Sequence, residues 1–127
     1  MARGAVKGAP GTSERFPGSL RLRRRKEFLR IQRQGIKVST DQLLALALRN
    51  PEGATRLGIT VSTKVGNAVV RNQIRRRLRE IFRRHRQLLP QGIDVVLIAT
   101  SRAGTADFAS LSGAYCTLAN KLKRHFS

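Results

Sequence analysis

Three stretches of the chain place apolar side chains three and four positions apart, a spacing that predicts three amphipathic helices. The first extends from Leu20 to Gly35, and the glycine suits a helix end. The second ends before Pro90 and Gly92, and Thr105 can cap the third. The apolar positions are Leu22, Phe28, Leu29 and Ile31 in the first helix, Val70, Ile74, Leu78, Ile81 and Phe82 in the second, and Phe108, Leu111, Tyr115, Leu118, Leu122 and Phe126 in the third.

The segment from Val38 to Leu48 contains the run Leu43-Leu44-Ala45-Leu46-Ala47-Leu48, whose composition suits either a strand or a helix. The tetrapeptide Asn50-Pro51-Glu52-Gly53 favours the strand. Proline in second place and glycine in fourth place fit a type I turn, which predicts a hairpin to the next strand.

That next strand is predicted from a period of two, in which Leu57, Ile59 and Val61 alternate with smaller or polar residues. The segment from Ile93 to Ala99 carries the uninterrupted apolar run Val95-Val96-Leu97-Ile98-Ala99, typical of a buried strand. The predicted order is helix, strand, strand, helix, strand, helix. We therefore expect a small α+β domain whose second helix crosses over between two strands.

The 127 residues, 40% of them hydrophobic, suffice for one domain with one modest core. Residues 1–19 are rich in Gly, Ala, Pro, Ser and Thr, which predicts a disordered tail before a folded domain at 20–127. An organelle transit peptide has a similar composition, but we favour a tail of bacterial type and a cytoplasmic protein. No apolar run reaches the roughly 18 to 20 residues that a membrane span requires.

The net charge of +19, from 26 basic and 7 acidic residues, makes nucleic acid the expected partner. Eight arginines and one acid, Glu80, lie between Arg71 and Arg86. A charged helix face is ordinarily just solvated, but one this dense repels itself unless a polyanion neutralises it. Gly66 and Asn67, just before this helix, can offer backbone N–H groups to a phosphate, although a simple turn would also need a small residue.

The sequence predicts neither a catalytic site nor a metal site within the protein. Phosphodiester hydrolysis usually needs clustered carboxylates or a histidine pair, whereas the acids are scattered and His85 and His125 are isolated. The single cysteine, Cys116, allows no intrachain disulfide or cysteine-rich zinc site and suits a small buried residue. Phe28, among basic residues, could stack on an unpaired base or belong to the core.

The segment Leu57-Gly58-Ile59-Thr60-Val61-Ser62-Thr63-Lys64-Val65-Gly66-Asn67-Ala68-Val69-Val70-Arg71-Asn72 resembles the signature of the bacterial ribonuclease P protein component. The resemblance continues through Ile74-Arg75-Arg76-Arg77-Leu78-Arg79-Glu80 and extends from about Leu20 to the C-terminus. It implies a mixed sheet with a central cleft, packed by helices, and a left-handed crossover through the arginine-rich helix. The residue pattern alone would favour a right-handed crossover.

The implied function is that of the protein subunit of a ribonucleoprotein that removes the 5′ leader from precursor tRNA. The implied partners are the catalytic RNA subunit and the precursor tRNA, and the implied cofactor is Mg²⁺ held by the RNAs. The protein would be a monomer, in either a single or a dimeric holoenzyme. The implied contacts to the RNA subunit are Lys64, Asn67, Arg71, Asn72, Arg75, Arg76 and Arg79. The implied leader contacts in the cleft are Phe28, Arg30 and Arg33.

Three positions depart from the family pattern. Gln73 replaces the second arginine of an Arg-Asn-Arg motif, and Gln32 and Leu46 occupy positions that are often aromatic. Leader stacking should then depend more on Phe28 and on charge. The alternatives are a small basic ribosomal protein, a DNA-binding module and a protein-only endonuclease, all of which the signature disfavours.

Overall fold

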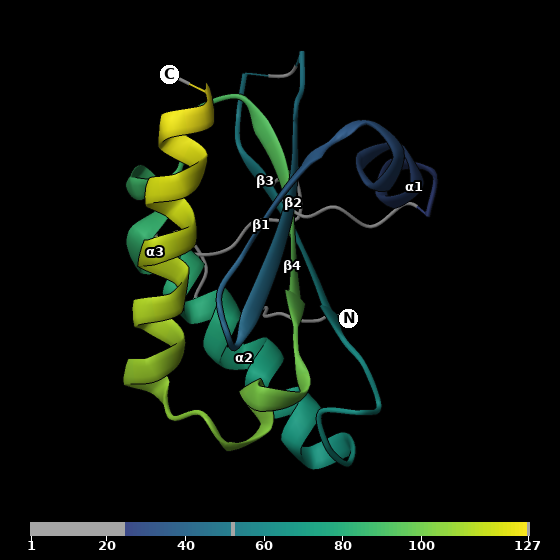
Figure 1. Cartoon of the computed structure of the whole chain (residues 1–127), viewed down its shortest axis with the longest axis vertical. Coiled ribbons are helices and arrows are strands. Elements are labelled where there is room, and N and C mark those ends of the chain that lie inside the picture. Colours follow the sequence, from purple (N-terminus) through teal and green to yellow (C-terminus); the bar gives the residue numbers. More distant parts are fainter. Residues whose placement is uncertain (1–24, 52, 127) are drawn as a thin grey trace, which may run out of the picture.

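A computed structural model describes residues 25–51 and 53–126, so the tail predicted at 1–19 lies outside the described residues. The described residues form three α-helices, four strands and two short 3-10 helices (Figure 1). In chain order the elements are α1 (Arg25–Gln34), β1 (Ile36–Ser39), β2 (Leu43–Arg49), β3 (Arg56–Val61), α2 (Ala68–His85), η2 (Arg86–Leu88), β4 (Ile93–Ala99), η3 (Ser101–Thr105) and α3 (Phe108–Phe126).

The four strands form one mixed sheet in the order β1-β2-β4-β3. The central strands β2 and β4 are antiparallel, whereas β3 runs parallel to β4. Helix α2 therefore connects two adjacent parallel strands, as the predicted crossover requires. The α+β class is confirmed, while the hand of this crossover stays a prediction.

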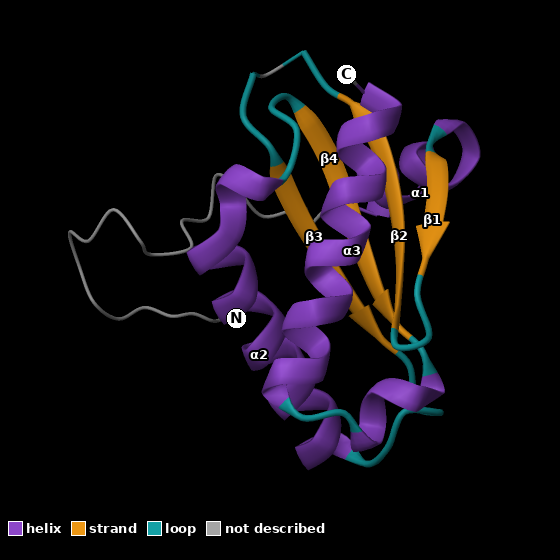
Figure 2. Ribbon diagram, turned by 60° about the vertical axis from the view of Figure 1, so that its left-hand side comes forward, coloured by secondary structure: helices purple, strands orange, loops and turns teal. Residues whose placement is uncertain are grey.

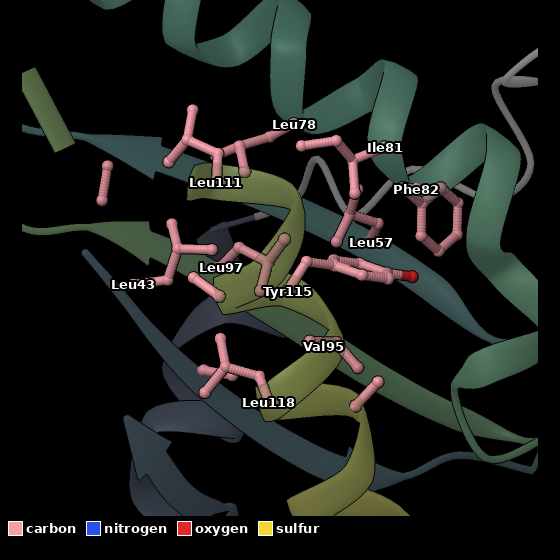
Figure 3. Packing of buried hydrophobic residues seen from close by; sticks show 14 of the residues in the cluster. Leu43, Leu57, Leu78, Ile81, Phe82, Val95, Leu97, Leu111, Tyr115 and Leu118 are labelled. Atoms are coloured by element: carbon pink, nitrogen blue, oxygen red, sulfur yellow. The ribbon is translucent and has the colours of Figure 1, made fainter. Parts of the chain in front are cut away.

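The helices cover both faces of the sheet (Figures 1 and 2). Successive strand residues point to opposite faces, so β2 directs Leu43, Ala45 and Ala47 into the main core with α2 and α3. Tyr115 and Phe82 are the largest fully buried side chains of that core (Figure 3). Helix α1 lies on the other face, where its residue Ile31 forms a smaller buried cluster with a residue of β4.

Strand rather than helix is confirmed for the stretch from Val38 to Leu48, but the prediction of one continuous strand is wrong, because two strands occupy it. They are antiparallel neighbours, β1 and β2. Between them Thr40 N–H donates to the carbonyl of Leu43 (2.7 Å), and Leu43 N–H donates to Thr40 Oγ1 (3.2 Å). Short polar side chains compete with strand pairing in this way, so the chain turns.

The predicted hairpin between β2 and β3 is also wrong, because β4 lies between these two strands. Apart from Asp94 and the terminal Arg49, β2 and β4 are apolar on both faces, and such strands belong in the centre of a sheet. Strand β3, with Arg56 and Thr60 on one face, takes the edge. The chain does reverse near Pro51, but Glu52 of the predicted turn lies outside the described residues.

The cap predicted at Thr105 is wrong, because Thr105 belongs to η3 and α3 begins at Phe108. The side chain of Asp107 caps α3, with Oδ1 accepting from Ser110 N–H (2.8 Å). This hydrogen bond lowers the pKa of the Asp107 carboxyl. The predicted apolar face of α3 is confirmed, with four positions buried and the terminal Phe108 and Phe126 partly buried.

Candidate nucleic-acid interface

Helix α2 is fixed to the core by one apolar face. Ile74, Leu78, Ile81 and Phe82 are buried as predicted, and Val70 packs at the edge of the core. The remaining positions of this helix are almost all polar or basic. Packing therefore holds the helix in place and presents its arginines to the outside.

The start of α2 is fixed by Asn67, whose Oδ1 accepts from Val70 N–H (3.0 Å). Asn67 is one of the predicted RNA contacts, and its side-chain oxygen is already engaged by this N-cap hydrogen bond. A Cβ on Gly66 would lie 2.9 Å from a methyl group of Val70, so glycine lets the turn approach the helix closely. The turn interpretation of Gly66 thus has direct structural support. Lys64, in the same loop, is exposed.

Arg71, Arg75 and Arg79 follow one another at four-residue steps and are partly exposed. Arg71 Nε donates to the carbonyl of Gly66 (3.2 Å), and Arg75 Nη1 donates to Asn72 Oδ1 (3.1 Å). Burial first, and the positive charge of Arg75 second, lower the pKa of Arg79. A guanidinium nevertheless keeps its charge in proteins. The helix therefore carries closely spaced guanidinium groups, and hydrogen bonds orient those of Arg71 and Arg75 before any ligand binds.

Glu80, the only acid of α2, neutralises just one end of the helix. It accepts hydrogen bonds from Arg83 and from Arg84, whose Nε lies 2.7 Å from Oε2. The bond from Arg83 contributes most to lowering the pKa of the Glu80 carboxyl. Within the part of the chain that the structure describes, the predicted RNA contacts themselves have no carboxylate partner. The basic surface, as we call it, comprises Lys64, Asn67, Arg71, Asn72, Arg75, Arg76 and Arg79.

On the opposite face of the sheet, α1 carries the three predicted leader contacts. Phe28 is half-buried, packed with Leu46, Leu48 and Ile98 around Ile31. The core interpretation of Phe28 is partly confirmed, because its ring packs on the sheet and is only half-buried, while stacking on a base stays a prediction. We call Phe28, Leu46, Leu48 and Ile98 the apolar shelf.

The two arginines of α1 differ in their surroundings. Arg33 is exposed in the last turn. Arg30 Nη2 donates instead to Oδ2 of the buried Asp94 (3.2 Å), and 37% of the Arg30 side chain is exposed. The sequence placed both arginines beside a leader but did not predict this ion pair.

An ion cluster below α1 was missed altogether by sequence reasoning. It joins Asp94 of β4 to Arg30, Arg56 and Asn50, and Arg56 also contacts Glu27 of α1. The available signal was a lone acid within the apolar run of Ile93–Ala99, since a charge in a buried strand needs partners. The partners themselves are distant in sequence and could not be named from it.

The histidines and the cysteine serve the fold or lie at its edge. The backbone carbonyl of His85 accepts from the hydroxyl of Tyr115 (3.1 Å), and the ring of His125 packs edge-on against Phe126. Cys116 is half-buried rather than fully buried.

Among the described residues, no three His, Cys, Asp or Glu side chains gather closely enough to hold a metal ion. No helix in that part of the chain has the length and apolar character of a membrane span.

Comparisons with known proteins agree on one family. The family model described as Ribonuclease P matches residues 16–123. The ribonuclease P protein component of Citrifermentans bemidjiense is 40% identical over 116 residues, which cover 91% of this chain and 99% of that protein. The corresponding protein of Desulfovibrio desulfuricans is 40% identical over 114 residues, covering 87% and 88%.

Solved structures give the same result. The ribonuclease P protein of Thermotoga maritima superposes with a TM-score of 0.72 at 36% identity, covering 82% of this chain and 96% of that one. The protein of Staphylococcus aureus superposes with a TM-score of 0.73 at 31% identity, covering 81% and 96%.

The fold and the basic surface define a small α+β RNA-binding protein. The chain belongs to the family of ribonuclease P protein components. Members of this family are protein subunits of a ribonucleoprotein endoribonuclease that acts in tRNA processing. The ribosomal, DNA-binding and protein-only interpretations are therefore not favoured.

Proposed function

We propose that the basic surface of α2 binds the catalytic RNA subunit of ribonuclease P. The observation that carries this proposal is the row Arg71, Arg75 and Arg79, which has no carboxylate partner within the described residues. Closely packed RNA phosphates repel one another, and guanidinium groups relieve that repulsion through paired hydrogen bonds. Gln73 is exposed on the same helix, so the neighbouring arginines supply the charge that this position lacks.

The apolar shelf and the arginines of α1 hold the 5′ leader of precursor tRNA in this proposal. Phe28 stacks on an unpaired base, and Arg30 and Arg33 bind leader phosphates. Leu46, rather than an aromatic residue, lies beside Phe28, so stacking depends on Phe28 alone within the apolar shelf. Gln32 is exposed and adds no stacking surface.

Catalysis belongs to the RNA subunit in this proposal, and the Mg²⁺ ions are held by that RNA and its substrate. The protein tightens substrate binding and lowers the magnesium concentration that the reaction requires. We place this activity in the bacterial cytoplasm, with one protein monomer per RNA subunit.

Precursor-tRNA cleavage at low magnesium tests this assignment, with protein alone, RNA subunit alone and both together. Cleavage at the mature 5′ end should require both. Cleavage by the protein alone would contradict an RNA catalyst. Failure of the mixture, with the RNA subunit active at high magnesium, would contradict the accessory role.

Two variants separate the proposed surfaces, because α1 and α2 lie on opposite faces of the sheet (Figure 1). Arg75→Ala should weaken binding of the RNA subunit and leave the preference for a leader intact. Phe28→Ala should weaken the preference for a leader and leave binding of the RNA subunit intact. If both variants weaken the same step equally, the two surfaces do not have separate roles.

A further inference from the structure

Asp94 is the one fully buried charged side chain among the described residues. Arg56 binds it through two hydrogen bonds, Nε to Oδ1 and Nη2 to Oδ2, both 2.8 Å. Asn50 Nδ2 donates a third bond to Oδ1 (2.7 Å). This fork-to-fork geometry is the strongest type of charged pair, so Arg56 and Asn50 already go far to satisfy the buried carboxylate.

Arg30 is an additional cation on a carboxylate that already has one. Its distance to Asp94 Oδ2 is 3.2 Å, longer than the two bonds from Arg56, and its side chain is 37% exposed against 18% for Arg56. The contact employs Nη2 alone, whereas a guanidinium has five N–H donors. Asp94 therefore binds only Nη2 of the Arg30 guanidinium and leaves its other N–H donors at the protein surface.

The position of this fork links it to the proposed leader site. Asp94 lies opposite Leu48 in the β2–β4 register, and Leu48 belongs to the apolar shelf with Phe28. Glu27, one turn before Arg30 on α1, contacts Arg56 (3.1 Å). Two ionic contacts thus attach α1 to the sheet beside the shelf, and both converge on Arg56 and Asp94.

We propose that Asp94 is a positioning residue for leader recognition, acting through Arg30. The buried carboxylate fixes the Arg30 guanidinium so that its remaining N–H groups meet a phosphate of the single-stranded leader. A fork that is fixed before binding loses less conformational freedom when it captures the phosphate. The inference rests on the proposed leader site, and it adds a residue that never touches the RNA.

The quantity to measure is the leader contribution. We define it as the ratio of the holoenzyme dissociation constants for tRNA without its leader and for precursor tRNA. Arg30→Lys keeps the charge but removes the planar fork, and it should lower the leader contribution about fivefold. Arg25→Lys is the matched control on the same helix, at an exposed arginine with no carboxylate partner among the described residues and no assigned leader contact, and it should change the leader contribution less than about twofold.

A double-mutant cycle then tests the path through Asp94. Asp94→Asn should reduce the leader contribution in the otherwise wild-type protein but cause no further loss in the Arg30→Lys background. A general loosening of the fold would lower it equally in both backgrounds and would overturn the inference. Unchanged affinity for the RNA subunit confirms that each variant is folded. If Asp94→Asn does not fold, the comparison of Arg30→Lys with Arg25→Lys decides alone, and equal effects of these two variants on the leader contribution overturn the inference.

These outcomes are distinct from failure of the leader site itself. If Phe28→Ala lowers the leader contribution and Arg30→Lys does not, only the role of Asp94 and Arg30 is overturned. If the leader contribution is the same with the wild-type protein as with the RNA subunit alone, both the proposed leader site and this inference are overturned.

Discussion

Arg75 and Arg84 lie on the same helix, yet their guanidinium groups have different surroundings. Arg84 Nε donates to Glu80 Oε2 at 2.7 Å, and Glu80 also pairs with Arg83. Arg75 donates to the neutral amide of Asn72 at 3.1 Å. A carboxylate neutralises its partner, whereas an amide oxygen only orients it. Position in the fold therefore distinguishes arginines that the sequence makes look alike.

The first prediction compares these two arginines. Arg75→Ala should weaken binding of the RNA subunit roughly tenfold, the size expected for losing one charge-assisted phosphate contact. Arg84→Ala removes the same side chain from the same helix, but Glu80 already offsets part of its charge, so the loss should stay below about threefold. Filter binding at fixed salt measures both. Equal losses would mean that net charge, not placement, sets the affinity.

Tyr115 supplies a second prediction at the scale of one residue. Burial above all raises its pKa beyond the ordinary value, and its hydroxyl donates to the carbonyl of His85. The folded state thus keeps the phenolic proton to higher pH than the unfolded chain, which releases it near pH ~10. The stability from this group is complete below pH ~10 and falls as the pH rises above it.

The measurement is the free energy of unfolding as a function of pH. Tyr115→Phe should cost about 1 kcal/mol at neutral pH, the usual contribution of one hydrogen bond. It should also remove the tyrosine part of the decline above pH ~10. Because the chain has one tyrosine, tyrosinate absorbance reports this group alone. Ionisation near pH ~10 without unfolding would contradict the buried position.

At the scale of elements, close backbone contacts decide how α1 meets the sheet. A Cβ on Gly35 would lie 2.5 Å from the carbonyl oxygen of Ile31 and 2.7 Å from that of Ala47. Neither backbone atom can rotate away as a side chain could. The glycine that ends α1 therefore also lets the helix turn directly into β1 beside β2.

The third prediction uses one substitution at two glycines. Gly35→Ala should lower the free energy of unfolding by roughly 1–3 kcal/mol, because the added methyl group displaces backbone. Gly113→Ala, in α3 with nothing within 4 Å of its added Cβ, should raise it by about 0.5–1 kcal/mol through better helix propensity. Urea denaturation compares the two variants. A shift of the same sign in both would refute the contact argument.

Elements with long periodic patterns were predictable from sequence, and short polar interruptions were not. The stripe from Ile74 to Phe82 identifies the buried face of α2, since packing follows the 3.6-residue period. The division between β1 and β2 depends on hydrogen bonds of Thr40, and the N-terminus of α3 on Asp107 rather than Thr105. Single polar residues of this kind are too common in sequences to mark a boundary by themselves.

At the scale of the whole molecule, the sheet separates two candidate RNA surfaces. The basic surface belongs to the face with α2 and α3, and the apolar shelf belongs to the face with α1 (Figure 2). Charge density pointed to the arginines of α2, and the family resemblance supplied the other residues of the basic surface. The ion cluster of Asp94 and Arg56, by contrast, required the register of β3 against β4. The order of strands in the sheet could not be predicted from the hydrophobic pattern. The turn residues favoured a hairpin of β2 and β3, but β4 lies between these two strands.

The last prediction follows from the net charge of +19. Binding of the RNA subunit should weaken with salt as if roughly 5 to 10 phosphates were neutralised, because cations bound to the RNA are released when the protein docks. Arg75→Ala should reduce this slope by about one, and Phe28→Ala should leave it unchanged. The logarithm of affinity against that of salt concentration measures the slope. An affinity insensitive to salt would contradict the electrostatic account, and an equal slope change in both variants would place the apolar shelf in the same contact as α2.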